Sequence, residues 1–314
     1  MSDDCKAQGV SGVRGRFAPS PTGELHLGHA QTMLLCWLQV RSMGGVLVLR
    51  IEDVDRGRTR PGAEEGILRD LRWLGFDWDE GPDCGGPLGP YRQTECTERY
   101  LACLEQLAHR LFECTCTRKE IRLAAGVMED HRGELRYPGT CRAAPAAAER
   151  SERSIRVRVD EEVLCWDDLW LGPCREDTGQ VCGDFILRAK NGDFTYQLAC
   201  VADDIAEGIT HVLRGEDLVD STGRQILLHR WLGSDAPPLF AHTPLRKDGK
   251  GIRLAKSRGS PGLGVLREAG EDPRLLLAEL AHGLGLVDEP GLALTPAELI
   301  PSFSERMPQL VRSA

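Results

Sequence analysis

The pattern that most restricts the fold lies near the start of the chain, where two short apolar segments flank a helical one. VRGRFA (13–18) is typical of a short strand, and from Ala30 the apolar residues recur on one helical face. After a Gly-Gly break, VLVLRI (46–51) is a continuous apolar run of the kind that a parallel strand buried on both faces shows. This β-α-β unit predicts an α/β fold built on a doubly wound parallel sheet.

The same periodicities predict further elements along the chain. They are helices over 62–74 and 95–113, an alternating strand at 154–159, apolar and aromatic strand material over 185–204, and a segment at 209–218 that leads to a helix capped by Ser221 or Thr222. Beyond Ser257 the pattern is mostly helical. The strands resume after a segment of different character, which predicts an insertion between two halves of one sheet.

Composition is that of a folded soluble protein. The 314 residues are 41% hydrophobic and 28% charged, which is enough for two domains and a sizeable core. No apolar run approaches membrane-spanning length and the start of the chain lacks a secretory pattern, so we expect a cytoplasmic protein with no membrane partner. The twelve cysteines are scattered, and most are expected to be reduced thiols.

The charge is unevenly distributed along the chain. A net charge of −9 argues against indiscriminate nucleic-acid binding. Residues 110–158 alone carry eleven Lys and Arg against seven Asp and Glu. A polyanion such as RNA is therefore expected to meet this middle segment, although a solvated face of mixed charge has the same composition.

The turn in RFAPSPTGELHLGH (16–29) opens onto a helix start. Its prolines restrain the backbone after the strand, and its glycines permit a tight turn and the close approach of a ligand. Free amides at a helix start favour an anion, and His26 and His29 stand on one face, where they can donate to phosphate oxygens. Two such histidines also fit packed or exposed side chains. Their place at the start of a parallel sheet predicts a nucleotide site without a Lys-Ser/Thr phosphate loop or a dinucleotide fingerprint.

Three cysteines are clustered in the basic segment. ECTCTR (113–118) brings two thiols within one residue of each other, and YPGTC (137–141) adds a third about twenty residues later. Three thiolates and one nitrogen or oxygen donor would complete a tetrahedral zinc site, for which His131 is the orthodox fourth ligand. Three unpaired thiols remain the alternative.

Several long motifs resemble the class I aminoacyl-tRNA synthetases in their glutamyl form. They are RFAPSPTGELHLGH with its HIGH-type tetrapeptide HLGH, LRIEDVD (49–55), YQLACVADD (196–204), HVLRGEDL (211–218) and RLAKS (253–257), the last in the place of the KMSKS loop. The resemblance covers residues 14–260 in order and spacing. It implies a Rossmann-type doubly wound parallel sheet with an inserted zinc-binding subdomain and a short helical C-terminal region.

The resemblance also implies boundaries and roles. The expected parts are a flexible N-terminus (1–12), the first half of the catalytic domain (13–110), an inserted acceptor-type zinc subdomain (111–184), the second half with the Lys loop (185–257) and a helical region (258–314). The implied catalytic residues are His26, His29 and Lys256, and the implied ATP-binding residues are His26, Gly28, His29 and Lys256. The implied glutamate-binding residues are Arg16, Phe17, Ala18, Pro19, Ser20, Glu52, Tyr196 and Arg214.

Two cofactors are expected. One structural Zn²⁺ would be held by Cys114, Cys116, Tyr137 and Cys141, because the resemblance favours Tyr137 over His131 as the fourth ligand. Mg²⁺ would travel with ATP. The Lys loop departs from the family pattern at Arg253, which keeps the positive charge of the usual Lys, and at Ala255, which replaces the usual Ser.

Within this family, the chain most resembles the short glutamyl-queuosine tRNA(Asp) synthetases, which lack the anticodon-binding domain. The expected function is ATP-dependent activation of L-glutamate and its transfer to the queuosine base in the anticodon of tRNA(Asp), by a monomer. One alternative is a truncated conventional glutamyl-tRNA synthetase acting on tRNA(Glu). The other is an inactive synthetase-like protein that binds RNA or ATP.

Overall fold

The structure is a computed structural model of the chain that describes residues 12–125, 136–142, 151–234, 236–244 and 261–312. A parallel sheet lies at its centre, in the strand order β2-β1-β8-β9. These strands are β1 (Arg14–Phe17), β2 (Val46–Leu49), β8 (His211–Gly215) and β9 (Leu239–Thr243). The predicted parallel α/β sheet is therefore confirmed.

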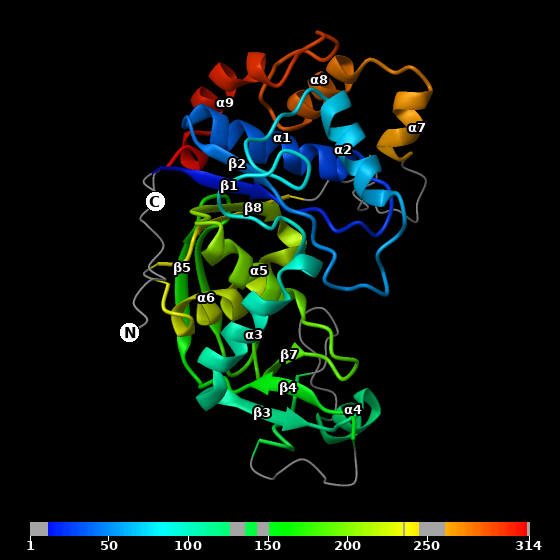
Figure 1. The fold of residues 1–314 in the computed structure, drawn as a ribbon. Helices are drawn as coiled ribbons and strands as arrows, with labels where there is room; N and C mark the ends of the chain where they lie inside the picture. Colours follow the sequence, from blue (N-terminus) through cyan, green and yellow to red (C-terminus); the bar gives the residue numbers. More distant parts are fainter. Residues whose placement is uncertain (1–11, 126–135, 143–150, 235, 245–260, 313–314) are drawn as a thin grey trace.

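Helices cover both faces of this sheet (Figure 1). One face carries α1 (Leu27–Ser42), α2 (Ala63–Trp73), α8 (Pro273–Gly283) and α9 (Ile300–Arg306), with the short α7 (Leu263–Glu268) packed against α2. The other face carries α5 (Tyr196–Ala206) and α6 (Thr222–Trp231), with α3 (Thr97–Gln106) against α5.

The strand β2 shows why both faces must be covered. Its side chains alternate in direction, so Leu47 and Leu49 pack into one apolar cluster while Val48 packs into the other. All three side chains are fully buried. A continuous apolar strand thus has no solvated side, as its sequence predicts.

The middle of the chain forms two smaller sheets, of which one lies at an end of the molecule and the other runs up to the central sheet (Figure 1). An antiparallel sheet has the order β3-β4-β7, and a hairpin pairs β5 with β6. These elements are β3 (Leu111–Cys114), α4 (Arg118–Ala125), β4 (Ser154–Val157), β5 (Val163–Asp168), β6 (Gly172–Asp177) and β7 (Phe185–Arg188). We refer to residues 111–188 as the insertion, since β7 pairs with β4 and not with the central sheet.

Two predicted elements are wrong. Most of the strand material expected over 194–204 is the helix α5, in which Leu198 to Ala202 form a continuous apolar run that is buried on all sides. The helix expected over 95–113 ends at Gln106, because Leu111–Cys114 pairs with β4 instead.

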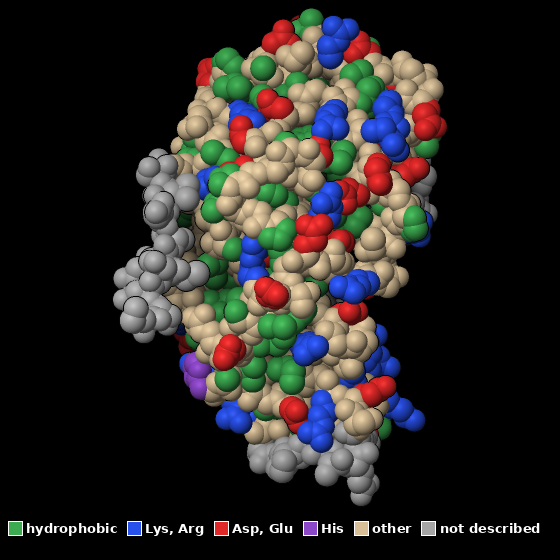
Figure 2. All heavy atoms as spheres, viewed as in Figure 1, with side chains coloured by type: hydrophobic (Ala, Val, Ile, Leu, Met, Phe, Trp, Pro, Cys, Tyr) green, Lys and Arg blue, Asp and Glu red, His purple; other side chains and the backbone are tan. Residues whose placement is uncertain are grey.

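The visible surface carries charges of both signs. Figure 2 shows Lys and Arg interspersed with Asp and Glu over the visible face, without a patch of one sign that covers it. Among the described residues, no helix is both long and apolar enough to cross a membrane.

Candidate active site and cysteine cluster

A cleft of about 1220 Å³ opens at the carboxyl ends of three parallel strands. The turn after β1, the segment after β2 and the end of β8 line it together with the start of α5. In doubly wound sheets this edge is where ligands bind. The predicted residues that lie in its wall are Arg16, Phe17, Ala18, Pro19, Ser20, His26, Gly28, His29, Glu52, Tyr196 and Arg214.

Backbone hydrogen bonds join the first two motifs at this edge. The amide of Arg50 donates to the carbonyl of Phe17, and the amide of Glu52 donates to that of Pro19, each at 3.0 Å. These bonds continue the β1-β2 pairing beyond the strands. They hold Glu52 against the proline turn, which explains why residues 33 positions apart in the sequence form one wall.

The helix start is capped by its own histidines. Nδ1 of His26 accepts from the amide of Gly28, and Nδ1 of His29 accepts from the amide of His26, each at 3.1 Å. The amide of Gly28 is therefore not free for a phosphate, contrary to expectation. A Cβ on Gly28 would lie 3.0 Å from the His26 ring, so the glycine makes room for this cap. With both Nδ1 atoms accepting, each neutral ring carries its proton on Nε2.

A buried charge network lies beneath the cleft. Arg50 contacts Glu207 at 2.7 Å, Asp204 at 2.8 Å and Glu52 at 3.3 Å, and Arg16 contacts Asp204 at 3.3 Å. Burial alone would lower the pKa of Arg16, but Asp204 raises it, so this guanidinium stays charged. Burial raises the pKa of Glu52, and it raises that of Glu207 to about 7 despite Arg50.

Arg214 at the end of β8 is also buried in the cleft wall, but its environment differs. Its Nη1 donates to Gln225 at 2.7 Å and to the Tyr196 hydroxyl at 3.4 Å, and its Nη2 donates to Thr222 at 3.0 Å. Its Nε donates to Nε2 of His242 at 2.9 Å. All these acceptors are uncharged side chains.

Other residues of the wall were not predicted from the sequence. Gln197 follows Tyr196 on α5, Asn191 and Asp193 lie in the turn before it, and Arg118 begins α4 of the insertion. Their proximity depends on the packing of the insertion against the sheet, for which no short motif gives a signal. Lys256, Arg253, Ala255 and His131 lie outside the described residues.

The three clustered cysteines meet in the insertion. Their sulfur atoms lie within 4.8 Å of one another, and those of Cys116 and Cys141 are 3.5 Å apart. The Tyr137 hydroxyl lies 3.5 Å from the sulfur of Cys114 and 4.0 Å from that of Cys116. A tetrahedral zinc with bonds of about 2.3 Å holds its sulfurs roughly 3.8 Å apart, so these side chains fit such an ion.

Arg156 on β4 supplies positive charge beside this cluster. Its guanidinium lies 4.0 Å from the centre of the Tyr137 ring, and it is buried. Burial would raise the pKa of the Cys114 thiol, but hydrogen bonds from Tyr137 and Arg156 lower it to about 7. Such a thiol readily becomes the thiolate that a metal requires.

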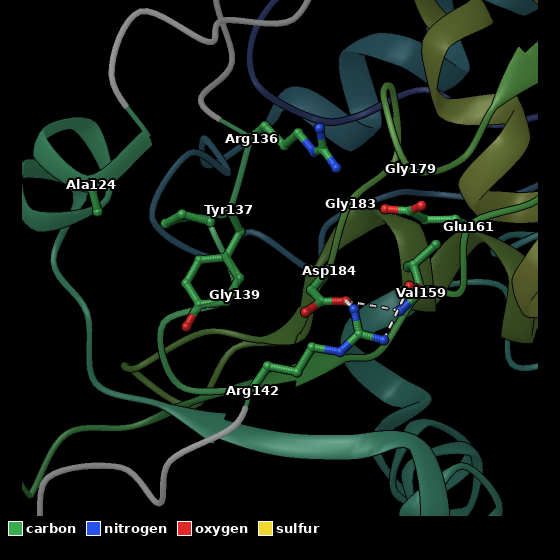
Figure 3. Close-up of a pocket in the computed structure, with 11 residues that line it drawn as sticks. Ala124, Arg136, Tyr137, Gly139, Arg142, Val159, Glu161, Gly179, Gly183 and Asp184 are labelled. Atoms are coloured by element: carbon green, nitrogen blue, oxygen red, sulfur yellow. Dashed lines mark hydrogen bonds and ion pairs between the residues drawn. The ribbon is translucent and has the colours of Figure 1, made fainter.

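A smaller cavity of about 320 Å³ lies next to the cluster (Figure 3). Arg142 reaches across it to the Asp184 carboxylate at 3.6 Å and the Val159 carbonyl at 3.4 Å, while Asp184 accepts from the Val159 amide. These contacts tie Arg142, which follows Cys141, to residues that flank β4 and β7. The contacts around this cavity therefore support the cysteine cluster.

Comparison with known proteins identifies the class. Residues 12–298 match the family model described as tRNA synthetases class I (E and Q), catalytic domain. The chain therefore belongs to this class, whose members use ATP with Mg²⁺, an amino acid and tRNA.

Individual relatives narrow the assignment. The glutamyl-Q tRNA(Asp) synthetase of Symbiobacterium thermophilum is 47% identical over 92% of this chain and 91% of the relative. That of Nitratidesulfovibrio vulgaris is 45% identical over 88% of each chain. The chain is a member of the glutamyl-Q tRNA(Asp) synthetase family.

A solved structure supports the fold. The glutamate-tRNA synthetase of Elizabethkingia anophelis is 31% identical, with a TM-score of 0.78 over 92% of this chain. The chain spans 65% of the length of that protein. The predicted class I synthetase fold is confirmed.

Proposed function

We propose that this protein uses ATP to convert L-glutamate to glutamyl-adenylate and then transfers the glutamate to the queuosine base in the anticodon of tRNA(Asp). One observation carries the choice of acceptor. The 47% identity to a glutamyl-Q tRNA(Asp) synthetase extends over about nine tenths of both chains. The cleft supports the activation step, since its charged residues suit glutamate and the two histidines at its helix start suit a phosphate.

In the activation step, a glutamate carboxylate oxygen attacks the α-phosphorus of ATP and pyrophosphate leaves. The protein's part is to align the reactants and stabilise charge. The Nε2–H groups of His26 and His29 would donate to phosphate oxygens at the start of α1. Mg²⁺ bound with ATP supplies further positive charge to the phosphates, and Lys256 would approach the leaving pyrophosphate.

Glutamate needs two cations and one anion around it. Arg16 and Arg214 would bind its carboxylates, since guanidinium groups match carboxylates in geometry as well as charge. Glu52 would accept hydrogen bonds from the α-ammonium. The positive charge of this group would offset the desolvation cost of the buried Glu52 carboxylate. Tyr196 bonds Arg214 and lies in the same wall.

In the transfer step, a hydroxyl of the queuosine cyclopentene ring attacks the acyl carbon and AMP leaves. The bases of an anticodon loop can be splayed out for single-strand recognition, so the cleft would receive a single base of the loop. A structural zinc held by Cys114, Cys116, Tyr137 and Cys141 would stiffen the insertion against the RNA. It would take no part in the chemistry.

Incubation with labelled glutamate and ATP tests this proposal. Four acceptors are compared: tRNA(Asp) and tRNA(Glu), each with and without queuosine. We expect label on queuosine-bearing tRNA(Asp) alone. Label on the 3′ end of tRNA(Glu) would instead identify a conventional glutamyl-tRNA synthetase. Absence of any glutamate-dependent exchange of pyrophosphate into ATP would identify an inactive scaffold.

A further inference from the structure

Arg214 is a buried cation without a buried anion beside it. The residue is 4% exposed, and no carboxylate among the described residues forms an ion pair with its guanidinium. The other two buried arginines near the cleft, Arg16 and Arg50, both pair with Asp204. An unpaired buried charge is costly, so Arg214 is held ready for a negative group that arrives from outside.

His242 occupies the place where a carboxylate would be expected. It lies on β9 directly beside Arg214 on β8, as its register partner. Its Nδ1 lies 2.5 Å from Oδ2 of Asp168, at the end of β5, and its Nε2 lies 2.9 Å from Nε of Arg214. When Nδ1–H donates to the carboxylate, Nε2 presents its lone pair to the arginine.

The surroundings keep this imidazole neutral and fixed. Burial lowers the pKa of His242 and Arg214 lowers it further, while Asp168 opposes them. The other oxygen of Asp168 accepts from the backbone amides of His242, Trp170 and Leu171. The carboxylate is therefore anchored on one side and orients the ring on the other.

We propose that His242 and Asp168 are positioning residues, which aim the Arg214 guanidinium at a carboxylate of the amino-acid substrate. The imidazole serves here because it accepts a hydrogen bond from Arg214 without adding a negative charge that would compete with the substrate. Thr222 completes the arrangement, since its hydroxyl lies within hydrogen-bond distance of both Arg214 and His242. The inference rests on the proposed assignment of this cleft to glutamate.

Two substitutions of His242 separate its two hydrogen bonds. In His242→Gln the carboxamide reaches the position of Nε2 and can still accept from Arg214. In His242→Asn it reaches only the position of Nδ1, so it keeps the contact with Asp168 and loses the one with Arg214. A hydrogen bond to a charged group is worth about tenfold to a hundredfold in affinity.

The readout is glutamate-dependent exchange of pyrophosphate into ATP, without RNA. We expect His242→Asn to raise the KM for glutamate about 50-fold, and His242→Gln and Asp168→Asn to raise it about fivefold. The kcat and the KM for ATP should stay within about threefold of the wild-type values. The lost interaction binds glutamate equally well in the ground state and in the transition state, so only the KM for glutamate rises. His211→Gln is the matched control, since His211 is buried on β8 but bonds the backbone carbonyl of Arg312 outside the cleft.

The possible outcomes distinguish a failure of the positioning role from a failure of the proposed function. If the two His242 variants raise the KM for glutamate equally, or if neither raises it, the positioning role is wrong. A loss confined to kcat or shared equally by the KM for ATP would also overturn it. A wild-type protein without any exchange would overturn the proposed function, and the positioning role with it. Thermal melting separates these outcomes from misfolding, because a folded variant keeps a cooperative transition.

Discussion

Arg214 in the cleft and Arg156 in the insertion are both buried, and neither has a carboxylate partner among the described residues. They differ in where their counter-charge comes from. Arg156 has the sulfur of Cys114 and the ring of Tyr137 beside it, so its counter-charge belongs to the chain itself. Arg214 has only neutral acceptors, so its counter-charge must come from a molecule that enters and leaves. One arginine marks a resident site and the other a substrate site.

The largest effect is expected when the two arginines are replaced in the same way. Arg214→Met should lower kcat/KM for glutamate in pyrophosphate exchange by about 10³-fold, because the substrate carboxylate would be left unpaired in a buried site. Arg156→Met, the matched control, should leave exchange within about twofold. Equal losses in both variants would show that the contrast between the sites is false.

The second effect concerns the cysteine cluster. Cys141→Ser should remove bound zinc and lower transfer to RNA by about tenfold or more, because the Tyr137–Cys141 segment would lose its anchor. Pyrophosphate exchange should stay within about threefold, since the cluster is outside the cleft wall. Metal analysis and the two assays are compared with Cys165→Ser, whose exposed thiol lies on the β5-β6 hairpin away from the cluster. A loss of exchange as large as the loss of transfer would make the metal part of the activation machinery.

A smaller effect tests Arg156 by itself. Arg156→Met should weaken zinc binding about tenfold, because the positive charge beside the thiolates would be gone. Competition with a coloured chelator measures this affinity. Unchanged zinc affinity would mean that Arg156 serves packing alone.

The smallest effect is on stability and comes from His229, buried on α6. Burial lowers its pKa, with Asp204 opposing, so the folded protein binds its proton less readily than the unfolded chain does. The stability that the neutral His229 contributes is therefore fully present above the pKa of histidine in the unfolded chain, about 6.5. It is lost as the pH falls below that pKa. Urea unfolding between pH 7.5 and 5.5 should show the advantage of wild type over His229→Gln shrinking at low pH. An advantage that grows at low pH would reverse the sign of this argument.

Much of the fold could be predicted because its signals are local. The run at Val46–Leu49 has no polar position, which only a strand covered on both faces permits. The turn before α1 has prolines and glycines at the places where the backbone requires them, and Gly23 adopts φ +150°. The helix α5 escaped prediction because its residues from Leu198 to Ala202 are a continuous apolar run, which fits a buried strand as well as a buried helix.

The candidate site was predictable only in part. The predicted site residues that the structure describes in these motifs meet in one cleft, but the histidines cap the helix start as well as facing the site. The pairing of His242 with Asp168 escaped notice, because 74 residues separate them and the hairpin reaches β9 only in the folded chain. The sequence of β9, LFAHT, gives no sign that its histidine orients an arginine.

A crystal structure with a non-hydrolysable glutamyl-adenylate analogue tests the central claim most directly. We predict that a carboxylate of the glutamyl group contacts Arg214, whose bond to His242 persists, and that the phosphate lies at the start of α1 beside His26 and His29. An analogue bound elsewhere, or bound in the cleft with Arg214 still surrounded by neutral groups alone, would contradict the account.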